Sequence, residues 1–160
     1  MSTLTVSRHF VEASLSGAER LGLDSRALLQ EAGISPDLLR IEMARVSSDQ
    51  FSKLMQVIWQ RTGDEFMGMG PRRARSGTFA TMCALVVGCQ TLEEVYQQAF
   101  RFSRLFEPMV SMELEILDDR VRLVTRIEGS IHDPDYFLRE SILVIWHRLG
   151  SWLIGQPVEL

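Results

Sequence analysis

The sequence predicts an α+β fold that is mainly helical, with a β-hairpin or small antiparallel sheet packed against long helices. Three observations support this prediction. Apolar residues recur at helical spacing over most of the chain, polar and apolar residues alternate over 111–127, and helical spacing returns after Asp133 and Pro134. A two-stranded hairpin is marginal on its own, so helices, further strands or a partner are expected to cover it.

The first 45 residues predict an N-terminal segment of short helices. One helix is expected over 5–22 and a second over 25–32, with Asp24 as the N-cap of the second and Gly33 at its C-terminal end. Pro36 then opens a further short turn, because proline is tolerated at the first helical position. The first helix should bury one stripe of side chains, namely Val6, Phe10, Ala13, Gly17 and Leu21.

Residues 28–35 read LLQEAGIS, which has the cadence of the turn in a helix-turn-helix. The helix that follows such a turn reads DNA with polar and basic side chains. Here it offers Arg40 and Arg45 against Asp37 and Glu42, too few cations for several phosphate contacts. The whole chain has 21 acidic and 17 basic residues and a net charge of −4. We therefore expect a helical hairpin that buries its apolar side chains: Leu28, Leu29, Ile34, Leu38 and Leu39.

The middle of the chain predicts three longer helices, which span 47–62, 78–87 and 91–106. Two of them begin with the pattern of a capping box, Ser47 with Gln50 and Thr91 with Glu94. Between the first two helices, residues 67–77 read MGMGPRRARSG. Three glycines and one proline in these eleven residues predict a loop.

The period then changes from helical to alternating. Two strands are expected on either side of a turn at Asp118 and Asp119, which places Glu115 opposite Arg122 on the solvent face. The expected inner face consists of Met112, Leu114, Ile116, Val121, Leu123, Thr125 and Ile127. A long helix should run from 133 to about 154, followed by the start of a strand at 158–160. Its apolar line consists of Leu138, Ile142, Ile145, Leu149 and Trp152.

Cysteine usage and hydropathy predict a cytoplasmic protein. Cys83 and Cys89 are the two cysteines, they form no CxxC motif, and they fall on different faces of the helical pattern, so a reduced setting is expected. The N-terminus lacks the apolar core of a signal peptide, and the apolar run over 84–89 is too short to span a bilayer. We expect one compact domain with an N-terminal helical segment, 1–45, and an α+β core, 46–160.

Three stretches together resemble a known family. They read LLQEAGISPDLLR, GPRRARSGTFATMCALVVGCQTLEEVYQQAFRFSRLFEP and FLRESILVIWHRLGSWLIGQPVEL. They resemble the N-terminal effector domain of AraC-type transcription regulators, in the subgroup called arabinose-binding-like, over about residues 8–160. The resemblance implies a sensor that binds a small-molecule effector, forms a homodimer and controls a C-terminal domain with two helix-turn-helix units. Nothing in this sequence corresponds to that domain, so DNA contact is expected only through it.

Two groups of side chains are candidates for effector binding. In residues 71–78, Arg75 and the helix start at Thr78 form a possible anion site, although Ser76 or Thr78 capping the helix explains the same pattern. Tyr96 and Trp146 are favoured as pocket residues because each carries a polar tip, whereas ordinary core packing is the alternative for the others. The expected ligand-binding set is Arg75, Thr78, Phe79, Met82, Tyr96, Phe100 and Trp146.

Catalytic and metal-binding signals are weak. The sequence has no GxSxG, Walker or GxGxxG motif, and its histidines at 9, 132 and 147 are too scattered for a zinc site. We therefore expect no catalytic residues, no metal and no cofactor. Two alternatives stay open. One is a small cytoplasmic enzyme that uses Cys83 and His147, with Arg75, on a carboxylate or amide, and the other is a purely structural oligomerisation domain.

Overall fold

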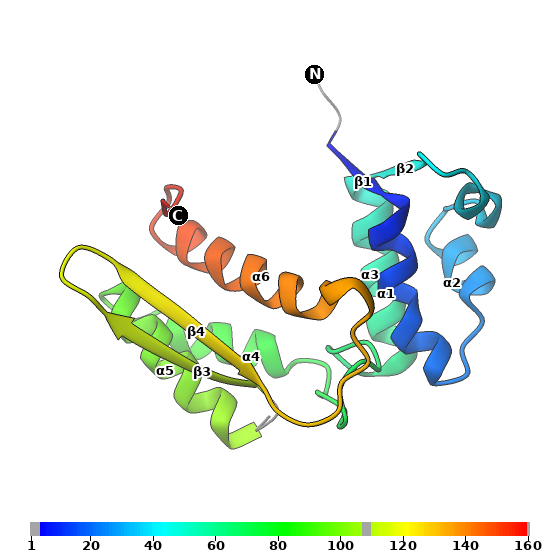
Figure 1. Ribbon diagram of the computed structural model, residues 1–160. Coiled ribbons are helices and arrows are strands. Elements are labelled where there is room, and N and C mark those ends of the chain that lie inside the picture. Colours follow the sequence, from blue (N-terminus) through cyan, green and yellow to red (C-terminus); the bar gives the residue numbers. More distant parts are fainter. Residues whose placement is uncertain (1–3, 107–109, 160) are drawn as a thin grey trace. The chain divides into compact units, whose positions relative to one another are not determined.

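The structure is a computed structural model that describes residues 4–106 and 110–159. Within these residues it has six α-helices, two short 3-10 helices and two antiparallel two-stranded sheets, which confirms the predicted mainly helical α+β class (Figure 1). The chain forms two compact units, Met1–Ser76 with Ile131–Leu138, and Gly77–Ser130 with Arg139–Leu160. Residues 46–76 therefore cluster with the N-terminal helices. The functional boundary between 45 and 46 stays a prediction.

The first unit is built from α-helices joined by a short sheet. In chain order its elements are β1 (Thr5–Ser7), α1 (Arg8–Arg20), α2 (Ser25–Glu31), η1 (Pro36–Arg40), β2 (Arg45–Ser47), α3 (Ser48–Thr62) and, after the second unit's hairpin, η2 (Pro134–Tyr136). The helix expected from residue 5 begins only at Arg8, because residues 5–7 are extended and pair with β2, with Val6 opposite Val46.

Helix α1 buries a different stripe from the expected one. Phe10 and Leu21, which the sequence placed in the core, are exposed. Ala13 and Gly17 are buried as expected, and the rest of the buried face is formed by Val11, Ser14, Leu15 and Ala18. The helical period is thus right, but its phase is rotated, because the small residues of this helix lie against the rest of the unit.

The local helix signals of this unit are confirmed. The Asp24 carboxylate accepts a hydrogen bond from the backbone N–H of Arg26 at 2.9 Å. Ser47 and Gln50 form both hydrogen bonds of a capping box, at 3.0 and 3.2 Å. The LLQEAGIS segment packs inward as expected: Leu28, Leu29 and Ile34 are buried, and Leu38 and Leu39 are half-buried.

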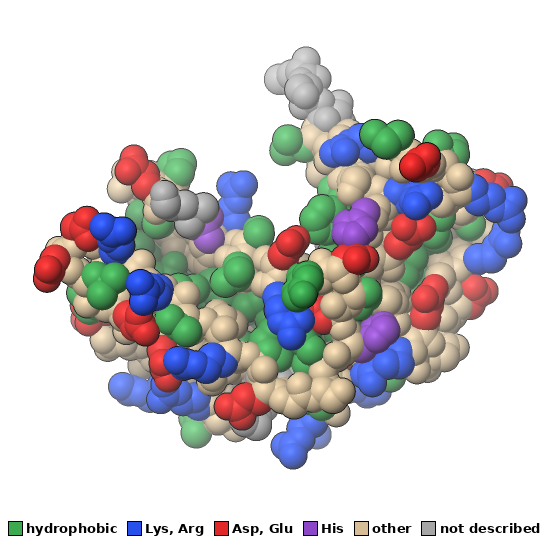
Figure 2. Space-filling view, in the orientation of Figure 1, with side chains coloured by type: hydrophobic (Ala, Val, Ile, Leu, Met, Phe, Trp, Pro, Cys, Tyr) green, Lys and Arg blue, Asp and Glu red, His purple; other side chains and the backbone are tan. Residues whose placement is uncertain are grey.

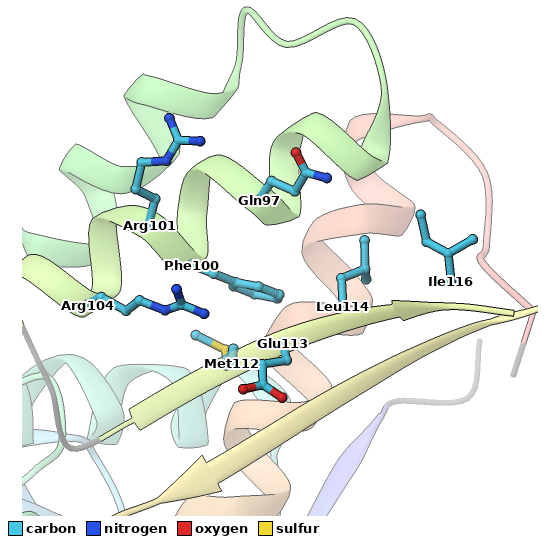
Figure 3. Close-up of a pocket in the computed structure, with 8 residues that line it drawn as sticks. All are labelled: Gln97, Phe100, Arg101, Arg104, Met112, Glu113, Leu114 and Ile116. Carbon is cyan, nitrogen blue, oxygen red and sulfur yellow. The ribbon is translucent and has the colours of Figure 1, made fainter.

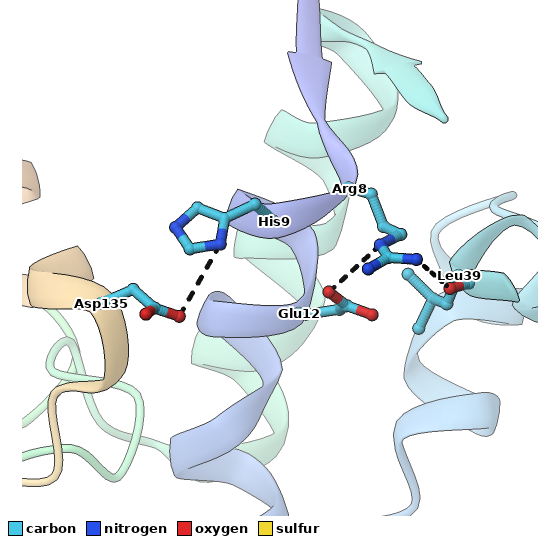
Figure 4. A network of polar contacts seen from close by, with 5 residues as sticks. All are labelled: Arg8, His9, Glu12, Leu39 and Asp135. Atoms are coloured by element: carbon cyan, nitrogen blue, oxygen red, sulfur yellow. Dashed lines mark hydrogen bonds and ion pairs between the residues drawn. The ribbon is translucent and has the colours of Figure 1, made fainter. Parts of the chain in front are cut away.

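Polar contacts tie the start of α1 to distant segments of the same unit (Figure 4). Arg8 donates a hydrogen bond to the carbonyl of Leu39 at 3.0 Å and forms an ion pair with Glu12 at 3.3 Å. On the other side, His9 Nδ1 lies 3.7 Å from a carboxylate oxygen of Asp135. The contact between His9 and Asp135, together with the hydrogen bond from the His132 N–H to the Met69 carbonyl at 2.8 Å, links residues 131–138 to the rest of the first unit.

The loop after α3 is ordered around one buried carboxylate. Asp64 accepts hydrogen bonds from the backbone N–H groups of Phe66, Gly68 and Ala74, at 3.0, 2.9 and 2.8 Å. The loop packs against α1 so closely that a Cβ at Gly17 would overlap the backbone of the loop. The sequence predicts a loop here, and the structure shows that it is a packed part of the core.

The second unit consists of helices around a β-hairpin. Its elements are α4 (Thr78–Val86), α5 (Leu92–Phe106), β3 (Val110–Ile116), β4 (Val121–Ile127) and α6 (Phe137–Leu153), which begins in the first unit. Helix α5 packs against both α4 and β3. The Thr91 hydroxyl accepts the Glu94 N–H at 3.1 Å, as a capping box requires, but the Glu94 carboxylate binds the N–H of Gln90 at 2.8 Å.

The hairpin register agrees with the prediction, whereas its burial does so only in part. Glu115 lies opposite Arg122 and forms an ion pair with it at 3.0 Å. Met112 is buried, but Ile116 is 61% exposed and Val121 is 59% exposed. The inner face of the hairpin is therefore buried at the start of β3 and exposed at the other end of the strand, next to the turn.

Helix α6 and the residues after it differ from the expected pattern in two ways. Ile145 and Trp152 are exposed, and Trp146 takes the buried place expected for Ile145. Val158 and Glu159 do not form the expected strand. Val158 instead folds back on α6, donating its N–H to the Ser151 hydroxyl at 3.1 Å and accepting from His147 Nε2 at 2.8 Å. No helix in the described parts of the chain is long and apolar enough to cross a membrane.

Candidate functional site

Three of the expected ligand-binding residues meet in an aromatic cluster. Tyr96 and Phe100 come from α5, and Trp146 comes from α6. The Phe100 and Trp146 rings lie edge to face with centroids 5.3 Å apart, and Tyr96 lies 5.9 and 6.1 Å from these two rings. Offset and edge-on aromatic pairs at such distances are favourable beyond their buried area. The cluster therefore joins α5 to α6.

The polar tip of Tyr96 is used inside this cluster. Its hydroxyl donates a hydrogen bond to the Trp146 carbonyl at 3.1 Å. A Cβ at Gly150 would collide with that hydroxyl oxygen, so the glycine leaves the space that Tyr96 fills. Burial raises the pKa of the Tyr96 hydroxyl further above its ordinary value, at which the group is already a protonated donor at neutral pH.

A pocket of about 340 Å³ lies beside the cluster (Figure 3). This volume is at the small end of the range of roughly 300–1,000 Å³ found for ligand pockets. Its lining comes from one face of α5 and from β3, and consists of Gln97, Phe100, Arg101, Arg104, Met112, Glu113, Leu114 and Ile116. Phe100 belongs to both the pocket and the cluster, so a molecule in the pocket would touch a ring that contacts Trp146.

The charges around the pocket are not balanced. Glu113 forms an ion pair with Arg126 at 2.7 Å. Hydrogen bonding and charge from Arg126, with a smaller contribution from Arg104, lower the pKa of the Glu113 carboxyl, which is therefore ionised and committed to Arg126. No ion pair among the described residues involves Arg101 or Arg104. The pocket thus carries excess positive charge.

The other four expected residues lie elsewhere. Arg75 is exposed in the first unit, where its backbone pairs with that of Asp64. Thr78, Phe79 and Met82 belong to α4 in the second unit, and they are half-buried, 40% exposed and buried, respectively. Arg75 and Thr78 therefore fall in different compact units. The anion site expected over 71–78 stays a prediction.

The start of α4 also differs from the capping alternative. Gly77 is its N-cap, with a positive φ of 94°, and glycine has no side chain with which to cap the helix. The Gly77 carbonyl accepts from both the N–H and the hydroxyl of Thr81, at 2.9 and 2.8 Å. The expectation that Ser76 or Thr78 caps this helix is therefore wrong, because a left-handed glycine makes the turn into it.

Sequence reasoning named one pocket residue, Phe100, and missed the other seven. A signal for the helical part was present: Gln97 lies three residues before Phe100 and Arg104 four residues after it, so both share its face, and Arg101 lies four residues after Gln97 at the edge of that face. Arginines next to a buried phenylalanine are typical of the boundary between the buried and the exposed face of a helix. Alternation in β3 placed Met112 and Leu114 on the inner face, but it gave no information about which helix faces them.

The alternative hypothesis of a small enzyme depends on His147 and Cys83. His147 Nε2 lies 2.8 Å from the Val158 carbonyl, so this nitrogen is engaged with the backbone. Cys83 is half-buried and is not part of a disulfide bond. In the part of the chain that the structure describes, no three histidine, cysteine or acidic side chains gather as metal ligands.

Comparison with known proteins places the chain in a family. Residues 22–160 match the family described as the arabinose-binding domain of AraC transcription regulators, N-terminal part. The chain belongs to this AraC family. A curated relative, the ornithine utilization regulator of Pseudomonas aeruginosa, is 20% identical over 151 residues, which cover 94% of this chain and 44% of the relative. The AraC-family chain thus spans less than half of that relative's length. No solved structure matches it significantly.

Proposed function

We propose that this chain is the effector-sensing domain of an AraC-type transcription regulator. It binds a small molecule in the pocket between α5 and β3 and acts on a DNA-binding domain outside these residues. The family match supports the regulatory role. The observation that carries the site is that Phe100 lines a pocket of ligand size and also packs edge to face on Trp146.

The shared ring offers a physical route for the signal. A molecule seated on Phe100 favours those positions of α5 and α6 in which Phe100, Tyr96 and Trp146 remain packed. A ligand shifts a conformational equilibrium only by its difference in affinity between the two states. We propose that the state with an ordered cluster is the one that the effector selects, and that Phe79 and Met82 on α4 act as secondary contacts.

The regulator is proposed to work in the cytoplasm, as a homodimer and without catalytic chemistry. The dimer is implied by the family resemblance. Sedimentation velocity with and without effector tests it, because an effector that binds the dimer better raises the dimer fraction.

Thermal unfolding of the 160-residue chain with a panel of metabolites tests the sensing function. The panel includes L-arabinose and L-ornithine, because the family and one relative carry these names. A ligand present at a hundredfold excess over its dissociation constant stabilises the fold by about 2.7 kcal/mol. We expect a clear rise in unfolding temperature with at least one compound.

A matched pair of variants locates the binding site. Gln97 lines the pocket and Gln98 does not, although both are exposed on α5. Gln97→Trp fills the pocket mouth and should abolish the rise in unfolding temperature, whereas Gln98→Trp should keep it. If no compound stabilises the chain, the sensing function is wrong. If both variants respond alike, the ligand binds elsewhere.

A further inference from the structure

We infer that the effector is a small organic carboxylate with an apolar body, bound in the pocket between α5 and β3. Its carboxylate lies at Arg104, with Arg101 as a second cation at the edge of the same helix, and its body lies against the apolar side chains of the pocket, Phe100, Met112 and Leu114. This inference rests on the proposed function and narrows it to one class of ligand.

The first step in the argument is charge. The chain as a whole is acidic, with a net charge of −4, yet two arginines, Arg101 and Arg104, are among the residues that line this pocket and form no ion pair among the described residues. Glu113 is the one acidic side chain among the lining residues that the structure describes, and it is already bound to Arg126 at 2.7 Å. A guanidinium binds a carboxylate with two parallel hydrogen bonds, so an anion is the ligand that this lining lacks.

The second step is the apolar surface. Phe100 and Met112 are buried, and Leu114 is half-buried, so the inner wall between the strand and the helix is apolar. Figure 3 shows the Phe100 ring and the Leu114 side chain directed toward the space between α5 and β3, with Arg104 on the side of Met112, whereas the Arg101 side chain lies on the side of α5 away from β3. A ligand that is charged at one end and apolar at the other satisfies both parts of this lining.

The third step excludes the other small-molecule classes. A cationic ligand would face Arg101 and Arg104 without a free carboxylate, because Glu113 is committed to Arg126. A sugar would place its hydroxyl groups against Phe100 and Met112, where they lose their hydrogen bonds to water without replacement. Among the described lining residues, Gln97 carries the one uncharged polar side chain, and a single amide is too little for a ring of hydroxyls.

Three probes of equal length separate these classes. Hexanoate, hexanamide and hexylamine share one alkyl chain and differ only in their polar end. We expect titrations followed by backbone amide chemical shifts to show hexanoate bound at α5 and β3. Because hydrogen bonds to charged groups are about twice as strong as neutral ones, hexanamide should bind about tenfold more weakly and hexylamine more weakly still.

Charge-matched variants test the role of the two arginines. Arg101→Gln with Arg104→Gln should weaken hexanoate binding by about tenfold or more. Arg40→Gln with Arg120→Gln removes the same charge at exposed positions outside the pocket and should leave the affinity within about twofold. Should the first double variant fold poorly, Arg101→Lys with Arg104→Lys keeps the charge and should bind hexanoate with intermediate affinity, since the two-pronged hydrogen bonding is lost.

The outcomes separate this inference from the proposed function. Hexanoate that fails to bind, a neutral or cationic probe that binds as tightly, or hexanoate binding unchanged in the Arg101 and Arg104 double variant would each overturn the carboxylate class. If a neutral or cationic metabolite then stabilises the chain and Gln97→Trp abolishes this, the sensing function stands and only the ligand class is wrong.

Discussion

The Asp64 side chain shows how one residue can organise a segment that has no regular secondary structure. Its carboxylate accepts three backbone N–H groups, from Phe66, Gly68 and Ala74, inside a unit where it is almost fully buried. Backbone N–H groups that are buried without a partner are costly, so a glycine-rich loop can only pack inward if something accepts them. Asp64 provides these acceptors and allows the loop to lie against Gly17 of α1.

Replacement of Asp64 by asparagine should destabilise the first unit by about 1–3 kcal/mol, the usual cost of leaving a buried donor unsatisfied. Asparagine keeps one acceptor oxygen, but its amide nitrogen would face either the Gly68 N–H or the two donors at the other oxygen. The free energy of unfolding in urea measures the effect. Asp37→Asn, at an exposed position, is the control and should change stability by less than about 0.5 kcal/mol.

A fall no larger for Asp64→Asn than for Asp37→Asn would show that the loop finds other acceptors. The sequence alone gave no sign of this role, because an aspartate that follows Gly63 at a helix end reads as an ordinary turn residue. Its partners lie two to ten positions away in a segment without periodicity.

At the level of elements, the contact between α5 and α6 depends on a fit between a large and a small residue. Tyr96 reaches over Gly150 and donates to the Trp146 carbonyl at 3.1 Å. The hydrogen bond and the two aromatic contacts of Trp146 lie within one turn of the two helices. This fit sets how closely the helices approach beside the pocket.

Gly150→Ala and Tyr96→Phe should therefore be coupled. Alanine in place of a helical glycine usually stabilises, but Gly150 is buried and a Cβ there meets the Tyr96 hydroxyl, so we expect a loss of about 1–3 kcal/mol from overpacking. In the Tyr96→Phe background that hydroxyl is absent, and Gly150→Ala should cost less than about 0.5 kcal/mol. Urea unfolding of the four proteins of this double-mutant cycle measures the coupling, and additive effects would contradict the fit.

Elements defined by neighbouring residues were predictable, and those defined by distant ones were not. The capping box of Ser47 and the register of Glu115 with Arg122 follow from short-range chemistry, and both are confirmed. Strand β1 was read as helix because its pairing partner, around Val46, is remote in sequence. The same reason explains the pocket: Phe100 was visible as an apolar helical residue, but the strand that faces it was not.

At the scale of the whole molecule, charge separates a sensor from a DNA reader. Acidic and basic side chains are interspersed on the face seen in Figure 2. The sequence carries a net charge of −4 and an isoelectric point of about 5.4. Most of the affinity of DNA-binding proteins comes from cations that neutralise phosphates, and this affinity falls steeply with salt. The segment with a helix-turn-helix cadence turns its leucines inward, which leaves few groups to read a groove.

We therefore expect the 160-residue chain alone to leave double-stranded oligonucleotides unshifted in a gel at about 0.15 M salt, whatever their sequence. Arg40→Gln with Arg45→Gln should make no difference, because these two arginines supply no binding to remove. Retardation that disappears in this double variant would show that the segment after LLQEAGIS does contact DNA.

The division into two units was also hidden from the sequence. Residues 131–138 belong to the first unit although the whole β-hairpin precedes them. Individual side-chain and backbone contacts join them to that unit. The His132 N–H donates a hydrogen bond to the Met69 carbonyl, and the ring of Phe137 lies near that of Phe10. Local periodicity reports which side of a helix is apolar, and it carries no information about which part of the chain will cover that side.

The two ion pairs on the outer face of the hairpin have a practical consequence for handling the protein. A sheet of two strands offers backbone hydrogen-bonding groups along both edges, and the apolar tip at Ile116 and Val121 is solvent-exposed. Such a corner is where molecules begin to stick together nonspecifically in concentrated samples. The ion pairs of Glu113 with Arg126 and of Glu115 with Arg122 place charges beside this corner, and such charges protect an exposed strand from aggregation. Variants that neutralise these charges should therefore be less soluble at high concentration, without any gain in core packing.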